Sequence, residues 1–221
     1  MKRSPERVAW IMLFGALLVC ISLGVGVPTA VFSYINSATN EAFLRVSLRA
    51  GQVQTSAPFE SAPSVVDLTG RQLKEGITVA VRDRSVGQLA FGATESAPAH
   101  LRVQLYSNAS VRLKRARVPR YQTNTAADSL ELELLDGRIE IDVPASTTRQ
   151  FKITISSATG DSVINRSGRY TLELSRQKQL QVTVRDGELT LTTTNRRATQ
   201  TLSGNQRALG AREGQRGRLS G

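Results

Sequence analysis

The sequence predicts an all-β domain, an antiparallel β-sandwich of jelly-roll type with a short β-solenoid as the alternative, preceded by one N-terminal transmembrane helix. Three observations predict this fold. Residues 8–27 form a run of 20 without a charged side chain. From Leu44 onward, apolar residues alternate with polar ones at a period of two, which is typical of half-buried strands. No window after the apolar run has the 3.6-residue spacing of an amphipathic helix.

Residues 8–27 are long enough to cross a membrane. At 1.5 Å per residue they measure about 30 Å, the thickness of a bilayer's hydrocarbon core. A cleaved signal peptide is the alternative, but its apolar region is shorter, and Pro28 weakens the best small-residue cleavage site. Trp10 and Tyr34 lie near the two ends of the uncharged stretch, where amphipathic rings favour the membrane interface. The sequence therefore predicts an uncleaved anchor over residues 8–35.

Basic residues predict the orientation of this anchor. Lys2, Arg3 and Arg7 precede it, whereas residues 36–44 contain no lysine or arginine. The positive-inside rule then keeps the N-terminus in the cytoplasm and exports the C-terminal part. We expect a single-pass protein of the cell membrane, with residues 1–7 as a cytoplasmic stub and residues 36–43 as a tether.

Three glycines, Gly51, Gly137 and Gly187, each centre a similar pattern of apolar residues. Apolar side chains occur at positions −7, −5, −3 and +2 from each glycine. Glycine takes a positive φ without steric cost, and the Asp-Gly pairs at 136–137 and 186–187 are strong hairpin signals. The pattern predicts a strand, a tight turn and a strand at each site. Strands with one apolar face predict two sheets over one core, and the irregular glycine spacing favours the sandwich over the solenoid.

This β domain is expected to cover residues 44–208 and to be followed by a basic flexible tail over residues 209–221. The net charge of the chain is +11, which at first suggests nucleic acid. The predicted topology places most of this charge outside the cell. Aromatic residues, the usual stacking platforms for bases, make up only 5% of the chain. We therefore expect no nucleic-acid partner.

The composition also argues against catalysis and against a metal or cofactor site. One cysteine and one histidine exclude a Cys/His zinc site and an intrachain disulfide. His100 has no recognisable nucleophile motif to serve, and the carboxylate pairs Glu131/Glu133 and Glu140/Asp142 occupy outward strand positions, as solvated side chains do. We predict no catalytic residue, no metal ligand and no cofactor. A hydrolase on a β scaffold is the weakest of the function hypotheses.

Residues 112–120 hold the one concentrated cluster of charge. A cluster of this kind suits an anionic polymer, lipid headgroups or an acidic protein partner. The interpretation that the pattern favours is a solvated edge strand, on which basic residues and Pro119 prevent aggregation between sheets. The candidate anion-binding or partner-binding residues are Arg112, Lys114, Arg115, Arg117 and Arg120.

Residues 101–208 contain four patterns of apolar residues and glycines in a fixed order. The first combines Val103 and Leu105 with Ser110, Val111 and Leu113; the second is Leu132, Leu134, Gly137, Ile139, Ile141 and Val143; the third is Phe151, Ile153, Ile155, Gly160, Val163, Gly168, Tyr170 and Leu172; the fourth is Val182, Val184, Gly187, Leu189, Leu202 and Gly204. None of these patterns is specific alone, but together, in this order, they resemble the FecR family of extracytoplasmic regulatory domains.

The resemblance implies a sensing or binding role in the bacterial cell envelope. FecR-like proteins carry a cytoplasmic domain that contacts a sigma factor, and residues 1–7 cannot provide one, so that activity is not carried over. We expect a membrane-anchored protein whose exported domain binds a partner or ligand in signalling or regulation. The alternative is a structural or adhesive envelope module that binds anionic wall polymer or lipid headgroups. Neither the ligand nor the oligomeric state follows from the sequence.

Overall fold

The structure is a computed structural model that describes residues 5–58, 62–92, 99–121, 126–145, 150–193 and 199–210. The chain divides into two compact units. One contains residues up to Thr39 together with residues 119–126, and the other contains residues 40–118 and 127 onward. Lys2, Arg3 and residues 211–221 of the predicted tail lie outside the described residues.

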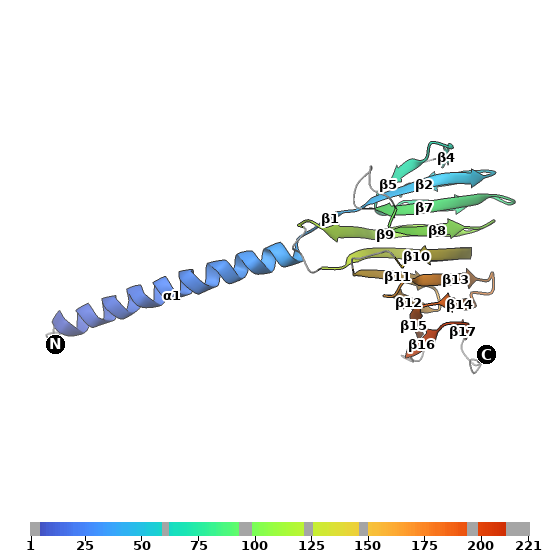
Figure 1. The fold of residues 1–221 in the computed structure, drawn as a ribbon. Coiled ribbons are helices and arrows are strands. Elements are labelled where there is room, and N and C mark those ends of the chain that lie inside the picture. The colour runs from blue at the N-terminus through green and yellow to red at the C-terminus, as the bar shows by residue number, and fades with distance from the viewer. Residues whose placement is uncertain are drawn as a thin grey trace. The chain divides into compact units, whose positions relative to one another are not determined.

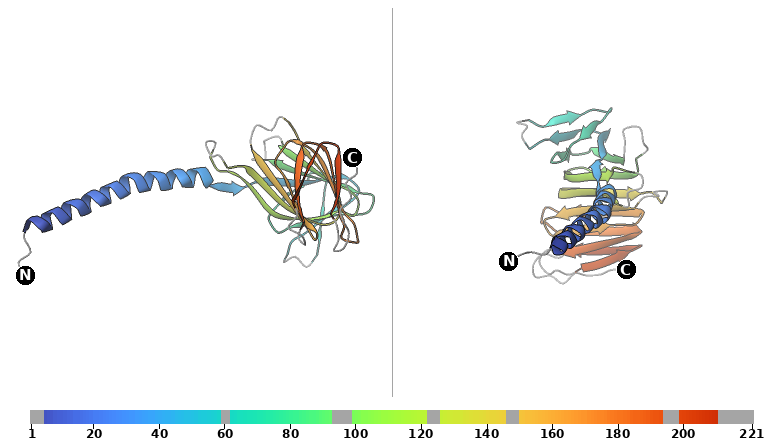
Figure 2. Two further views of the ribbon diagram at one scale, coloured as in Figure 1. Left: turned by 90° about the horizontal axis from the view of Figure 1, so that it is seen from below. Right: turned by 90° about the vertical axis from the view of Figure 1, so that its left-hand side faces the viewer.

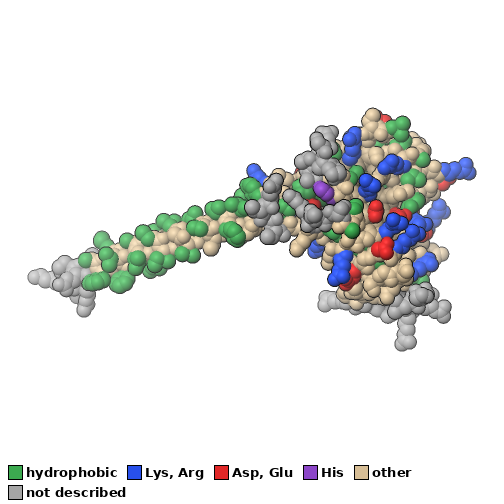
Figure 3. All heavy atoms as spheres, in the orientation of Figure 1, with side chains coloured by type: hydrophobic (Ala, Val, Ile, Leu, Met, Phe, Trp, Pro, Cys, Tyr) green, Lys and Arg blue, Asp and Glu red, His purple; other side chains and the backbone are tan. Residues whose placement is uncertain are grey.

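Helix α1 runs from Pro5 to Ser37 and includes the predicted anchor (Figure 1). Within it, Ala9–Ser37 is a candidate membrane span with a mean hydropathy of 2.4. Figure 3 shows hydrophobic side chains along the length of this helix, without lysine, arginine or acidic residues between them. A helix that is apolar on all sides is typical of a membrane span. Trp10 stacks on Phe14 near its start, with ring centroids 5.7 Å apart.

The other described elements are strands, as predicted, and they form two sheets that share strand β10 (Figures 1 and 2). The first sheet contains, in spatial order, β4 (Ser64–Val66), β3 (Val53–Ser56), β6 (Thr78–Val81), β9 (Ser110–Pro119), the first half of β10 (Asp128–Val143), β11 (Phe151–Ser157), β12 (Gly160–Ile164), β15 (Glu188–Thr193) and β16 (Thr199–Ser203).

The second sheet contains β5 (Arg71–Leu73), β2 (Phe43–Ala50), β7 (Val86–Gly92), β8 (Leu101–Leu105), the second half of β10, β13 (Gly168–Leu174), β14 (Leu180–Asp186) and β17 (Gln206–Gly210). A short strand, β1 (Thr39–Glu41), follows α1. Because the two sheets face each other and share a strand, their pairings form a nearly closed, barrel-like sheet.

The pairing is antiparallel throughout the described registers, except between β10 and β11. This arrangement confirms the predicted antiparallel all-β fold. A β-solenoid stacks its coils as parallel strands, so the solenoid alternative is wrong.

The hairpins predicted at the Asp-Gly pairs are also wrong, because the flanking strands do not pair with each other. Gly137 lies inside β10, which pairs with β9 and β11 before the glycine and with β8 and β13 after it. Gly187 separates β14 in the second sheet from β15 in the first. With φ values of 79° at Gly137 and 94° at Gly187, the chain turns from one sheet to the other and keeps its apolar side chains inside.

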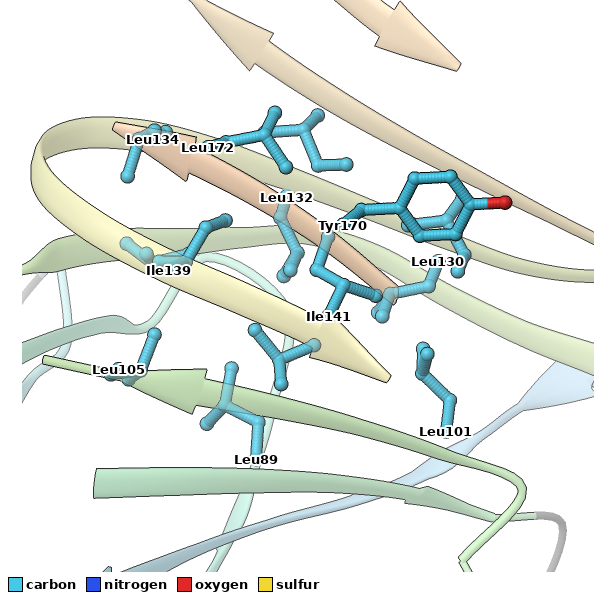
Figure 4. Close-up of a cluster of buried hydrophobic side chains, with 14 of the residues drawn as sticks. Leu89, Leu101, Leu105, Leu130, Leu132, Leu134, Ile139, Ile141, Tyr170 and Leu172 are labelled. Carbon is cyan, nitrogen blue, oxygen red and sulfur yellow. The ribbon is translucent and has the colours of Figure 1, made fainter. Parts of the chain in front are cut away.

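The core lies between the two sheets and consists almost entirely of the alternating apolar residues. Leu130, Leu132 and Leu134 from the first half of β10 are buried, as are Ile139 and Ile141 from its second half. Figure 4 shows these side chains pointing toward those of β7, β8 and β13. At about 25 cal/mol per Å² of buried apolar surface, this core is the main source of the domain's stability.

Candidate partner-binding surface

Strand β9 carries most of the predicted basic residues and is not an edge strand along its first half. Ser110 and Arg112 pair with β6 on one side and with β10 on the other. The edge-strand interpretation therefore fails for this half. The register against β10 shifts by one residue where Arg115 faces Glu131 and Leu113 faces Leu132, which is a β-bulge.

The bulge places two adjacent cations on the outer surface. Leu113 and Ala116 are buried on either side of it, whereas Lys114 and Arg115 are both exposed. In a regular strand, one of two adjacent side chains points inward. The extra residue removes that constraint, so the pair Lys114–Arg115 faces solvent together. We call this pair the bulge pair.

The neighbouring arginines of β9 are already bound to carboxylates. Arg117 Nη2 lies 3.1 Å from Glu75 Oε2, and Arg117 Nη1 lies 3.6 Å from Glu41 Oε1. Arg112 Nη1 lies 3.4 Å from Glu133 Oε2. These pairs hold Arg112 and Arg117 in place and offset their charge.

By contrast, neither member of the bulge pair has a carboxylate within 4.0 Å among the residues that the structure describes. Glu131 faces Arg115 across the ladder without forming such an ion pair. The bulge pair therefore presents two uncompensated positive charges on a rigid strand. Figure 3 shows lysine and arginine side chains gathered on the strand unit, with acidic ones between them.

Arg120, the fifth predicted cation, belongs to the other compact unit. Its backbone N–H donates to the carbonyl of Ala38 at 2.9 Å, and its guanidinium Nη1 donates to Tyr34 Oη at 3.5 Å. The five predicted residues thus separate into two bound arginines, the bulge pair and one arginine beside α1. The sequence pattern alone contained no signal for this division.

A groove of about 240 Å³ opens beside the bound Arg117. Its wall includes the carboxylates Glu41 and Glu75 and the buried side chains of Leu73, Leu113 and Ala116. Glu75 Oε1 also accepts a hydrogen bond from the Ala116 N–H at 3.2 Å. The groove therefore combines buried apolar residues with both acidic and basic side chains, since Lys74 also lines it, and Leu113 and Ala116 flank the bulge pair in sequence.

The outer face of the second sheet carries a network that the sequence did not reveal. Tyr106 Oη donates to Glu140 Oε2 at 2.7 Å, and the Arg138 guanidinium lies 4.9 Å from the centre of the Tyr106 ring. Burial, and then the bond to Glu140, raises the pKa of Tyr106. Arg169 Nε lies 3.9 Å from the other oxygen of Glu140. Among the described residues, Glu140 thus interacts with Tyr106 and Arg169 and not with a second carboxylate.

His100 and the buried Asp128 line a small apolar cavity at one end of the sandwich. Its volume is about 10 Å³, which is room for about one water molecule, and Leu101, Leu130 and Ile153 are among its other walls. Within the described ranges, no three histidine, cysteine or acidic side chains gather closely enough to hold a metal ion.

No family model and no curated protein matches the chain. Among solved structures, two crystal structures described as a "putative anti-sigma factor" from Parabacteroides distasonis ATCC 8503 are similar to part of it. They have 14% and 12% sequence identity and TM-scores of 0.46 and 0.45. In both cases the match covers 65% of this chain and 58% of the other chain.

Proposed function

We propose that this chain is a single-pass, membrane-anchored regulatory protein whose extracytoplasmic β domain binds an acidic protein partner in envelope signalling. One observation supports the proposal most strongly. The four FecR-like patterns, in their order, coincide with strands β8 to β16 of one sandwich, and most of their apolar positions are buried in its core. The proposal depends on these residues and not on the two similar crystal structures.

The proposed topology places the N-terminus of α1 in the cytoplasm. The helix is apolar enough to span a membrane, and Lys2, Arg3 and Arg7 lie before its candidate span, Ala9–Ser37, in the sequence. Strand β1 begins two residues after α1 ends, so in this topology the first strand follows directly after the extracytoplasmic end of the span.

The bulge pair is the proposed contact for the partner. Lys114 and Arg115 are exposed, adjacent and without a carboxylate partner among the described residues, and the pairing of β9 with β10 fixes the backbone that carries them. Charges of this kind speed the encounter with an oppositely charged partner and set its register.

The topology can be tested with single cysteines, because Cys20 is the only cysteine of the chain. In a Cys20→Ala background, Gln177→Cys places a thiol in the exposed turn between β13 and β14. We expect a membrane-impermeant maleimide to label it in intact cells. Labelling only after lysis would overturn the proposed orientation.

The contact can be tested by charge reversal. Lys114→Glu/Arg115→Glu should abolish co-purification of the partner from solubilised membranes. The control Arg185→Glu/Arg207→Glu changes the net charge by the same amount at exposed positions of the second sheet. This control should still co-purify the partner. A partner retained by both variants would contradict the proposed surface. If the wild-type protein captured anionic wall polymer, and only the Lys114→Glu/Arg115→Glu variant failed to do so, the result would instead favour the structural or adhesive alternative.

A further inference from the structure

The segment that follows β9 packs against the last turns of α1 within one compact unit. The Arg120 N–H donates to the Ala38 carbonyl, just beyond the end of the helix, at 2.9 Å. The Arg120 guanidinium reaches Tyr34 Oη at 3.5 Å and lies 5.6 Å from the centre of the Tyr121 ring. The β9–β10 connection is therefore attached to the end of the helix through both the backbone and the side chain of Arg120.

The three side chains of this cluster remain accessible. Tyr34 is 57% exposed and Tyr121 is 37% exposed. Arg120 is also exposed, and its contacts with other described residues carry no negative charge: they are a carbonyl, a phenol and an aromatic ring. Within the part of the chain that the structure describes, Arg120 has no carboxylate within 4.0 Å.

The position of the cluster determines what can approach it. Val31 and Phe32, which precede Tyr34 by less than one turn, are exposed apolar side chains of the candidate membrane span. Tyrosines at the end of such a helix lie at the level of the lipid headgroups. A guanidinium in the same place meets phosphate groups, to which it can donate two parallel hydrogen bonds.

We propose that Tyr34, Arg120 and Tyr121 form a lipid-headgroup site in which Arg120 binds the phosphate and the two tyrosine rings lie beside it at the membrane interface. The site depends on the proposed membrane span of α1. It would fix the β9–β10 connection at the membrane surface. Because Arg120 follows Arg117 by three residues, the Cα atom of Arg117 would lie within about 10 Å of the Cα atom of Arg120.

Depth-dependent fluorescence quenching tests the site in the full-length protein. Trp10 is the only tryptophan, so Trp10→Phe provides a dark background for Tyr121→Trp. The variant is reconstituted into vesicles of phosphatidylcholine and phosphatidylglycerol, with a nitroxide either near the headgroup or near the acyl terminus. We expect strong quenching of the indole at position 121 by the shallow nitroxide and weak quenching by the deep one.

Two matched reporters in the same Trp10→Phe background separate the possible outcomes. Tyr34→Trp reports on the helix itself, and Leu68→Trp reports on an exposed position between β4 and β5. Quenching at position 34 but not at position 121 would overturn the headgroup site while leaving the membrane span intact. Absence of quenching at both positions would instead contradict the span, and with it the proposed function. Equal shallow quenching at positions 68 and 121 would show that the quenching is not specific to this cluster, and would contradict the headgroup site.

The role of phosphate is tested by the arginine. Arg120→Gln should lower the shallow quenching at position 121 toward that at position 68, whereas Arg120→Lys should retain part of it. Arg112→Gln, which removes an exposed arginine of the first sheet, should leave it unchanged. Millimolar inorganic phosphate should not compete. If inorganic phosphate abolished the quenching, the site would bind free phosphate rather than lipid, and the proposal would fail.

Discussion

The hydroxyl of Tyr170 fills the space in which a side chain of Gly187 would lie. A Cβ at position 187 would overlap Tyr170 Oη. The same hydroxyl donates to the Arg166 carbonyl at 2.7 Å and accepts from the Glu188 N–H at 3.1 Å. One buried tyrosine thus connects the turn before β13 with the crossing from β14 to β15, and the glycine makes room for it.

Replacing Gly187 with alanine should therefore destabilise the domain strongly. The positive φ of 94° alone costs an alanine about 1–3 kcal/mol, and the overlap with Tyr170 adds to it. Urea unfolding of the full-length protein in detergent, followed by far-ultraviolet circular dichroism, measures the loss. Gly204→Ala is the control, because Gly204 lacks a positive φ and its nearest contact is at 3.3 Å. An equal loss in both variants would contradict the interpretation.

Tyr170→Phe should cost about 1–3 kcal/mol, because the Arg166 carbonyl and the Glu188 N–H lose their shared partner. It should also change how the free energy of unfolding depends on pH in alkaline solution. Burial raises the pKa of Tyr170 above its usual 10.0, so the folded state holds this proton more tightly than the unfolded chain does. The resulting stability is present below about pH 10 and is lost as the pH rises through the raised pKa.

Unfolding free energies measured between neutral and strongly alkaline pH test this dependence. The wild type should lose stability more steeply above about pH 10 than Tyr170→Phe does. The raised pKa of Tyr106 adds the same loss of stability at alkaline pH to both proteins. Identical slopes would show that the Tyr170 proton does not contribute.

The two carboxylates that bind Arg117 should differ in importance. Glu75 accepts from both Arg117 and the Ala116 N–H, and the side chains of Glu75 and Arg117 are each 29% exposed. Glu41 is 72% exposed and lies 3.6 Å from the same arginine. We expect Glu75→Ala to cost about 1–2 kcal/mol and Glu41→Ala less than about 0.5 kcal/mol. The same urea titration compares them, and equal effects would contradict this ranking.

Removing the hydroxyl of Ser162 should stabilise the protein. Ser162 is fully buried, and its Oγ has no hydrogen-bond partner among the described residues. An unsatisfied buried hydroxyl costs about 1 kcal/mol or more, so Ser162→Ala should raise the free energy of unfolding by about that amount. Ser156→Ala, on the outward side of β11, should change it by less than about 0.5 kcal/mol. A loss of stability in Ser162→Ala would imply a partner that the structure does not show.

The sequence was sufficient to predict the strands but not their partners. The alternation of Leu180, Val182 and Val184 predicted the inward face correctly, because a period of two is a local property of the strand. The Asp-Gly pairs were misleading, since a glycine with positive φ serves a hairpin and a crossing between sheets equally well. The choice between them depends on strands far away in the chain, such as β8 and β13.

The same limit applies to the candidate surface. The basic residues of β9 were visible in the sequence, but the bulge that exposes Lys114 and Arg115 together results from the register against β10. The partners of Arg117 and Arg120 come from distant segments, at Glu75 and Tyr34. A single strand contains no signal for any of these contacts.

Strand β10 also has a consequence for how the domain comes apart. Its 16 residues contribute hydrogen bonds to both sheets and separate the strands β2–β9 from the strands β11–β17. Neither group can detach without breaking bonds to this one segment, so the two groups should melt in a single cooperative transition. The amides of β10 should then be the last to exchange with deuterium, because only global unfolding exposes them.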